Sequence, residues 1–368
     1  MLIIPENTLA RAEKILFITH LAIGDFTYLQ NFFAAFAKQN PHLKIDLWID
    51  ELRRSNDPKQ WVYLKKYALY DWAEHCPFFN KVYRNTYSPA LLQESIQAAQ
   101  QENYPVVVSL ATLRPHRYAN LAREIGANSW VVGIKGKSRW YAPWDKSAYA
   151  KLHASFAPFQ RPKGGYHITA VYADWFRQLS GLQLDQKQRF PFIDIPQQWQ
   201  HYALTQLADW GVTEQQVSQG KKVVFINAFA KTKKRCWPLS SVAGLIMEMG
   251  KLPPWRDTCF IVNAVPQELE HAKSVLAQYK LNNTFLFSAG DNFFQLPAVL
   301  QRCDLIISVE TAVMHLANAV HVPVVALMRQ KNPEWVPIDQ DISTVITTSR
   351  RSEWVNAIKA EQVIKVIQ

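Results

Sequence analysis

A carboxylate follows the first apolar run of the chain. Residues 14–19, KILFIT, are typical of a buried parallel strand, and THLAIGDFTYLQ continues from them. Gly24 is predicted to make a tight turn, which places Asp25 near the start of a helix. There Asp25 can cap the helix by accepting a hydrogen bond from a free N–H, or it can act as a general base. No GxGxxG spacing is present, so this is not a dinucleotide fingerprint.

A cluster of cations lies just beyond a second predicted strand, at 221–229. A run of this kind is usually a solvated surface. At the end of a strand, however, Lys and Arg can neutralise the charge of a phosphate leaving group. The spacing is not that of a P-loop. The four cations are Lys231, Lys233, Lys234 and Arg235.

Polar residues also follow a predicted strand at 304–309. Glu310 and Thr311 lead into a helix, where Thr311 can cap free N–H groups that form an anion site. His315 lies one turn further along the same face. A lone histidine is usually structural, but a histidine and a threonine beside the cationic loop 231–235 favour a pyrophosphate site.

One further acid, Glu268, follows the predicted strand at 258–264. It can be an exposed acid that the helix dipole favours at a helix start. Alternatively, its carboxylate can accept both hydroxyls of a ribose.

Strands alternate with helical stretches along the whole chain, which predicts α/β layers with parallel sheets. The polar, Gln-rich stretch 180–220 is the expected connection between two domains. We therefore predict domains at 1–190 and 191–345, with a last helix in 346–368 that packs back on the first domain. The remaining strands are predicted at 44–50, 81–85, 104–110, 129–134, 283–289, 322–328 and 343–348.

Net positive charge is concentrated in the first half of the 368-residue chain. Residues 1–190 hold 24 Lys and Arg against 15 Asp and Glu, whereas residues 191–368 hold 17 against 15. The excess can serve solubility, or it can attract an anionic partner such as a phosphorylated substrate or a membrane surface. Aromatic and basic residues alternate in 135–153, which suits a lipid headgroup zone. Nucleic acid is the weakest candidate partner because no zinc-finger or RNP-like motif is present.

The remaining composition bounds the class of protein. No apolar run is long enough to span a membrane. The four cysteines lie far apart with no metal-ligand spacing, which argues against a zinc site and favours a reducing compartment. The first residues do not resemble a signal peptide. We therefore expect a cytoplasmic protein.

Residues 303–337 resemble the most specific segment of glycosyltransferase family 9, the ADP-heptose:lipopolysaccharide heptosyltransferases. That segment follows the pattern D-T-G-x-x-H-x-A-x-A-x-G-x-P-x-V-x-L-F-G and later P-x-x-W-x-P. The departures include Glu310 for Asp, and Ala312, His321 and Arg329 for Gly. The matching residues are Thr311, His315, Ala317, Ala319, Pro323, Val325, Leu327, Pro333, Trp335 and Pro337.

Three shorter stretches resemble the same family. Ile23, Gly24 and Asp25 correspond to its M-G-D, and Pro266 to Glu268 correspond to its P-x-E. Residues 234–238 correspond to its K-x-W-P, although the family's lysine falls where this chain has Arg235. The resemblance thus covers most of the chain.

The resemblance implies an α/β GT-B fold, in which two Rossmann-like domains face a central cleft. It also implies inverting, metal-independent transfer of heptose from ADP-heptose to the anionic inner core of lipopolysaccharide, without a cofactor. Asp25 would be the base, and Lys234 or Arg235 would stabilise the leaving diphosphate. The donor site would comprise Phe229, Lys231, Lys233, Glu268, Glu310, Thr311, Ala312 and His315. The acceptor site would comprise Gly24, Arg114, Arg117, Lys135, Lys137 and Arg139.

The implied location is the cytoplasmic face of the inner membrane of a Gram-negative bacterium, with the protein peripheral to the lipid. Several alternatives stay open. The chain can use another nucleotide sugar or a protein acceptor, or it can be a carbohydrate-binding homologue of low activity. Binding to nucleic acid has only the high isoelectric point in its favour, and we expect none.

Overall fold

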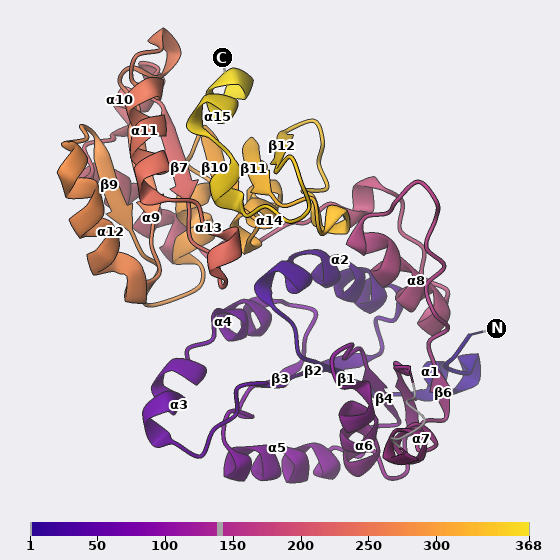
Figure 1. The fold of residues 1–368 in the computed structure, drawn as a ribbon. Helices are drawn as coiled ribbons and strands as arrows, with labels where there is room; N and C mark the ends of the chain where they lie inside the picture. Colours follow the sequence, from indigo (N-terminus) through magenta and orange to yellow (C-terminus); the bar gives the residue numbers. More distant parts are fainter. Residues whose placement is uncertain (1, 138–142, 368) are drawn as a thin grey trace. The chain divides into compact units, whose positions relative to one another are not determined.

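Two compact units make up the chain in a computed structural model that describes residues 2–137 and 143–367. The first comprises Met1–Lys163 and Ile168–Arg189, and the second comprises Gly164–His167 and Phe190–Gln368 (Figure 1). The chain therefore enters the second unit briefly at Gly164–His167 before it returns to complete the first.

The first unit contains a six-stranded parallel sheet in the order β3-β2-β1-β4-β5-β6. Residues 15–19 of its central strand are all buried, as a strand covered on both faces requires. Pairing aligns Ile15 with Ile45 of β2 and with Val106 of β4. The strands are β1 (Lys14–Thr19), β2 (Lys44–Ile49), β3 (Lys81–Tyr83), β4 (Val106–Ser109), β5 (Trp130–Gly133) and β6 (Ala154–Ser155).

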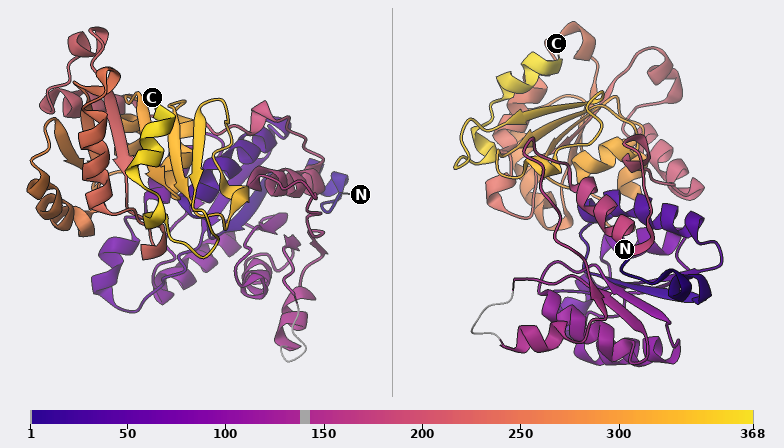
Figure 2. Two further views of the ribbon diagram at one scale, coloured as in Figure 1. Left: turned by 45° about the horizontal axis from the view of Figure 1, so that its top comes forward. Right: turned by 90° about the vertical axis from the view of Figure 1, so that its right-hand side faces the viewer.

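Helices cover both faces of this sheet (Figures 1 and 2). On one face, α2 packs against α8, and phenylalanines of both helices gather around Phe17 of β1. The rings of Phe17 and Phe33 lie 5.1 Å apart, edge to face. The helices are α1 (Glu6–Arg11), α2 (Ile23–Gln39), α3 (Pro58–Leu64), α4 (Ala68–His75), α5 (Pro89–Gln101), α6 (Pro115–Ile125), α7 (Pro143–Tyr149), α8 (Ile168–Ser180) and the 3-10 helix η1 (Lys187–Arg189).

The second unit contains another six-stranded parallel sheet, in the order β12-β11-β10-β7-β8-β9. Its strands are β7 (Val223–Asn227), β8 (Cys259–Asn263), β9 (Thr284–Phe287), β10 (Leu305–Val309), β11 (Val324–Met328) and β12 (Ser343–Thr347). Its α-helices are α9 (Gln197–Asp209), α10 (Glu214–Ser218), α11 (Leu239–Met249), α12 (Leu269–Leu276), α13 (Gln295–Leu300), α14 (Ala312–Ala319) and α15 (Ala360–Ile367). Its 3-10 helices are η2 (Lys233–Arg235), η3 (Pro253–Trp255), η4 (Pro266–Glu268), η5 (Ala277–Tyr279), η6 (Pro333–Trp335) and η7 (Val355–Ala357).

Both sheets have the same topology. Counted from the first strand of each unit, the spatial order is 3-2-1-4-5-6, which is the order of the Rossmann fold. The predicted α/β class with two Rossmann-like domains is therefore confirmed. In such sheets ligands bind beyond the carboxyl ends of the strands, where the strand order reverses. Those points lie between β1 and β4 and between β7 and β10.

The last helix corrects one expectation. We expected 346–368 to pack back on the first domain, but α15 lies against α11 and β12 of the second unit (Figure 1). Val363 is fully buried in that unit's core, and the Trp237 indole N–H donates to the Ile358 carbonyl over 2.8 Å. The apolar face of the helix is thus buried within the second unit.

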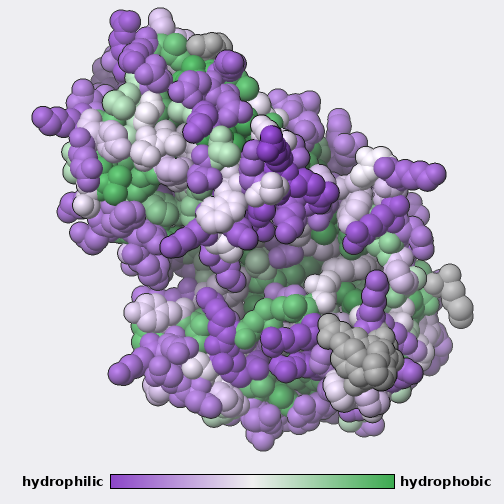
Figure 3. All heavy atoms as spheres, viewed as in Figure 1, coloured by the Kyte–Doolittle hydropathy of each residue, from purple (hydrophilic) through white to green (hydrophobic). Residues whose placement is uncertain are grey.

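Hydrophilic side chains cover most of the visible face of each unit, with hydrophobic areas between them (Figure 3). Within the described ranges 2–137 and 143–367, no helix combines the length and the hydropathy that crossing a bilayer requires.

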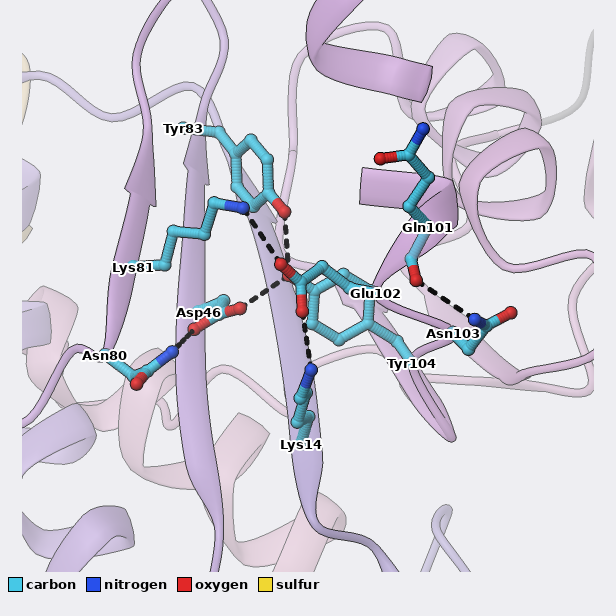
Figure 4. Close-up of polar contacts among 9 residues, drawn as sticks. All are labelled: Lys14, Asp46, Asn80, Lys81, Tyr83, Gln101, Glu102, Asn103 and Tyr104. Atoms are coloured by element: carbon cyan, nitrogen blue, oxygen red, sulfur yellow. Dashed lines mark hydrogen bonds and ion pairs between the residues drawn. The ribbon is translucent and has the colours of Figure 1, made fainter. Parts of the chain in front are cut away.

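A buried polar cluster ties strands together near their amino ends (Figure 4). The Asp46 carboxylate of β2 accepts hydrogen bonds from the Tyr104 hydroxyl over 2.5 Å and from the Asn80 amide over 2.8 Å. The Tyr83 hydroxyl lies 3.0 Å from that of Tyr104 and completes the chain of contacts. Asp46 is only 1% exposed. The donors that satisfy this buried side chain join β2 to the segments that begin β3 and β4.

We expect Tyr104→Phe to destabilise the first unit, because it removes a donor from the buried Asp46 carboxylate. A hydrogen bond to a charged group is worth about 1.5–3 kcal/mol, against about 0.5–1.5 kcal/mol between neutral groups. Tyr83→Phe is the matched control and should cost less. Chemical denaturation of both variants measures the difference, and equal losses would contradict this account of Asp46.

Candidate functional site

Asp25 lies at the carboxyl edge of the first sheet, in the first turn of α2. The helix begins at Ile23 with Ala22 as its N-cap, so Asp25 is the third helical residue and does not occupy the cap position, which was one of the two roles that the sequence left open. Gly24 likewise belongs to this first helical turn and not to a tight turn before it. The Asp25 Oδ2 atom accepts a hydrogen bond from the Ala22 N–H over 3.2 Å. The carboxylate therefore does stabilise the helix start, from inside the helix.

The second carboxylate oxygen of Asp25 meets a distant element. Its Oδ1 atom accepts a hydrogen bond from the Tyr172 hydroxyl of α8 over 3.1 Å. Burial raises the pKa of Asp25 above its ordinary value, while the contacts with Tyr172, Ala22 and His20 act in the opposite direction. A partly exposed carboxylate with a raised pKa is suited to removing a proton from a substrate.

Neighbouring strand ends are linked beside Asp25. The Leu113 N–H, beyond β4, donates to His20 Nε2, beyond β1, over 2.8 Å. The His20 ring lies 5.5 Å from the ring of Tyr118, whose hydroxyl donates to Asp50 Oδ2 over 2.8 Å. Asp50 directly follows β2, so side chains from three adjacent strand ends form one connected edge.

The predicted acceptor arginines lie on the same edge. Arg114 is the N-cap of α6, with a left-handed φ of 54° that is uncommon for a residue other than glycine. Arg114 and Arg117 are both exposed, and neither forms an ion pair with the residues that the structure describes. Lys135 and Lys137 are exposed beyond β5. Arg139 lies outside the described residues.

Two further ion pairs at this edge were missed by the sequence argument. Arg53 makes a bidentate pair with the buried Glu51 carboxylate, with contacts of 2.8 and 2.7 Å. Arg54 pairs with Asp50 and donates to the Thr86 carbonyl over 2.6 Å. The signal was present in WIDELRR, in which charged residues directly follow a predicted strand. Tyr172 had no such signal, because it lies 147 residues from Asp25.

In the second unit, a network of short polar side chains lies at the carboxyl ends of β7, β8 and β10. The Asn227 amide donates to Thr311 Oγ1 over 2.9 Å and to Ser308 Oγ over 3.1 Å. Its own oxygen accepts from Asn263 of β8 over 2.9 Å. Thr311 is the N-cap of α14 and accepts a hydrogen bond from the Val313 N–H, as predicted. The network thus fixes the start of α14, whose free N–H groups can bind an anion.

Glu310 lies directly before this helix start and is 5% exposed. Its Oε1 atom accepts a hydrogen bond from Asn332 over 2.8 Å and lies 3.5 Å from Arg235 Nη2. Its Oε2 atom is buried without a hydrogen-bond partner among the described residues. An unsatisfied buried carboxylate oxygen is costly, so a donor from a ligand would stabilise it.

The cationic loop brings only some of its members to this edge. Arg235 approaches Glu310, whereas the Lys234 ammonium lies 5.9 Å from the centre of the Trp354 ring. Lys231 and Lys233 are exposed. The loop is closed on itself by the Ala230 N–H, which lies 3.3 Å from the sulfur of Cys236. A contact between its two ends therefore holds this loop together.

The other predicted donor residues differ in their burial and in their place in the fold. His315 is buried in α14, and burial lowers its pKa to about 3, so its ring is neutral near pH 7. Glu268 is half-buried at the N-cap of α12, beyond β8. Phe229 is partly buried against the core of the second unit. Ala312 is the first residue of α14 and has a helical backbone.

Comparison with known proteins decides the family. The model of glycosyltransferase family 9 (heptosyltransferase) matches residues 125–363. The chain belongs to this family. A comparison with curated proteins gives no match.

Solved structures of family 9 share the fold. The glycosyltransferase of Veillonella parvula has a TM-score of 0.72 and 18% identity, over 96% of this chain and 95% of its own. The E. coli ADP-heptose lipopolysaccharide heptosyltransferase II has a TM-score of 0.68 and 14% identity, over 96% and 97%. E. coli heptosyltransferase WaaC, solved with ADP-2-deoxy-2-fluoro heptose, has a TM-score of 0.66 and 15% identity, over 96% and 98%.

One residue that departs from the family 9 pattern has a backbone conformation that favours glycine. His321 stands where the pattern has glycine, and its φ is 57°, in the left-handed region that favours glycine. The turn between α14 and β11 therefore has a backbone conformation that favours glycine, although this chain has histidine there.

We expect Arg235→Ala to weaken the binding of ADP more than Lys234→Ala does, because Arg235 lies beside the start of α14. Losing one charge-assisted contact should raise the Kd roughly tenfold to a hundredfold. Lys251→Ala, which removes an exposed cation of the same unit, is the control. Isothermal titration calorimetry measures all three. A larger loss in Lys234→Ala would assign the role to Lys234, and no loss in either would leave the loop a solvated charge run.

Proposed function

We propose that this member of family 9 is an inverting heptosyltransferase that uses ADP-heptose as donor and the anionic inner core of lipopolysaccharide as acceptor. The family assignment supports the class of reaction. The observation that carries the proposal is the Asp25 carboxylate, which is held at the carboxyl edge of β1 with a raised pKa.

The proposed acceptor side is the edge formed by the ends of β1, β2 and β4. There Asp25 removes the proton from the attacking hydroxyl group. The exposed guanidinium groups of Arg114 and Arg117, which pair with no acid among the described residues, suit carboxylates and phosphates of the acceptor. We propose the same role for Lys135, Lys137 and Arg139.

The proposed donor side is the edge around the start of α14. Arg235 or Lys234, together with the free N–H groups that follow Thr311, would bind the diphosphate. The buried Oε2 atom of Glu310 would accept a hydrogen bond from a sugar hydroxyl, and Glu268 would hold the ribose. The remaining proposed donor contacts are Phe229, Lys231, Lys233, Ala312 and His315.

The proposed reaction is a single displacement. The acceptor oxygen attacks the anomeric carbon while its proton passes to Asp25. The bond from that carbon to the diphosphate oxygen breaks, and its electron pair leaves with ADP. Charge grows on the diphosphate as the bond breaks, so cations and helix N–H groups fixed nearby stabilise the transition state. These groups would take the place of a metal ion, and no cofactor is required.

The proposed place of action is the cytoplasmic face of the inner membrane. The net charge of +9 in residues 1–190 supports attraction to an anionic lipid surface. The acceptor itself carries negative charge, so the same excess also favours its capture.

A transfer assay tests the proposal. Purified protein is incubated with a panel of nucleotide sugars and truncated lipopolysaccharides, with and without EDTA, and the products are identified by mass spectrometry. We expect heptose transfer from ADP-heptose that persists in EDTA. Transfer of another sugar, or to a protein, would replace the proposed substrates. Binding without transfer would indicate a carbohydrate-binding homologue, and a strict metal requirement would overturn the metal-free mechanism.

Asp25→Asn should reduce transfer by roughly 10²- to 10⁴-fold, the usual contribution of a positioned base. The asparagine oxygen can still accept from the Ala22 N–H, so the melting temperature and ADP affinity should change little. Asp185→Asn is the control, because the exposed Asp185 carboxylate accepts a backbone N–H, from Gln188, at a helix start away from the strand ends. If Asp25→Asn melts early yet keeps its specific activity when folded, Asp25 only stabilises the helix.

A further inference from the structure

The two oxygens of the Asp25 carboxylate are held by different parts of the chain. The Ala22 contact is local, three residues away along the same helix start, and any acid at that helical position can make it. The Tyr172 contact joins α2 to α8 and is long-range. Only the second contact ties the orientation of the carboxylate to the tertiary structure of the unit.

Tyr172 is itself fixed in place. Its side chain is 3% exposed, and its ring lies 6.3 Å from that of Phe32 on α2 and 5.3 Å from that of Trp175 on α8. Burial raises the pKa of Tyr172 well above its ordinary value, and the nearby Asp25 charge adds to this. The phenol therefore stays protonated at any working pH and donates to Asp25.

We propose that Tyr172 is a positioning residue for the base: its hydroxyl fixes the Asp25 carboxylate in the orientation from which it takes the proton of the acceptor. This inference rests on the proposed role of Asp25. Because a buried donor holds one oxygen of the carboxylate, the lone pairs that accept no hydrogen bond point in fixed directions. An oriented base reacts faster than one that samples several rotamers.

The titratable groups around this pair set the expected pH dependence. Asp25 interacts with His20 beyond β1, with Tyr67 before α4 and with Tyr172 on α8, and Tyr172 also interacts with Tyr28 of α2. Of these, the hydroxyl of Tyr172 is the side chain that donates directly to the Asp25 carboxylate. Its donor stabilises the charged form, so its removal raises the pKa of Asp25 further and leaves less of the base ionised at a given pH.

Tyr172→Phe in the full chain is the direct test, read from the pH dependence of kcat with both substrates saturating. The acidic limb should move upward by about one to two pH units, the shift expected for one lost hydrogen bond to a charged group. At pH values below that limb the rate should fall about tenfold to a hundredfold relative to the unaltered protein. The KM for the acceptor should stay unchanged, because the phenol is buried and acts through Asp25.

Tyr104→Phe is the matched control, because it also removes a buried tyrosine hydroxyl from an aspartate, at the opposite edge of the same sheet. It should lower stability without moving the acidic limb. Should Tyr172→Phe fold poorly, 3-fluorotyrosine at position 172 keeps the shape and is a stronger donor, and it should move the limb to lower pH.

The outcomes separate this inference from the proposed function. An unchanged acidic limb and kcat in folded Tyr172→Phe, together with an inactive Asp25→Asn, would overturn the role of Tyr172 alone. Full activity of Asp25→Asn would instead overturn the assignment of the base. A limb that moves equally in Tyr104→Phe would also overturn the inference, because the shift would then reflect lost stability.

Discussion

Parallel pairing is the constraint on which the rest of this structure depends. Each sheet buries its central strands on both faces, so those strands are almost entirely apolar and cannot contribute chemistry themselves. The polar side chains of the candidate sites therefore lie where strands end, and parallel strands end at one common edge. In both units the strand order reverses at the centre, and the residues capable of chemistry follow the two central strands.

The electrostatic environments of the two strand-end edges differ. At the first, burial opposes the charge of Asp25, and hydrogen bonds from Ala22 and Tyr172 restore part of it. The result is a carboxylate whose pKa is raised above its ordinary value, which suits it to accepting a proton. At the second, the side chains around Thr311 orient a helix start and a cation, Arg235, toward a place where negative charge can be held. One edge is thus suited to removing a proton and the other to binding a leaving anion.

The sequence predicted most of this fold because buried parallel strands are continuous apolar runs. Residues 14–19 form β1 with no change of boundary, and the other predicted strands shorten by one to four residues. Errors arose where tertiary contacts decide. Nothing local indicated that α15 would join the second core, since its apolar stripe fits any apolar surface. Asp25 lies near a helix start, as predicted, but Ala22 is the N-cap, because the exact first residue of a helix is set by backbone geometry.

Candidate site residues divide in the same way. Those that follow a strand in the sequence, such as Asp25 and Thr311, could be predicted from position alone. Tyr172 could not, because its partner lies on another helix and its own helix carries no motif. The charged residues of WIDELRR could have been found by the rule already applied to the other strand ends. Arg139 lies outside the described residues, so its role stays a prediction.

The configuration of the anomeric carbon in the product tests the central claim most directly. A single displacement with Asp25 as the base and the diphosphate leaving from the opposite face must invert that carbon. Proton NMR of the donor and of the purified product, from one transfer reaction, reports both configurations. The account predicts inversion. Retention would contradict it, because retention requires either a second displacement through a protein nucleophile or attack from the face of the leaving group.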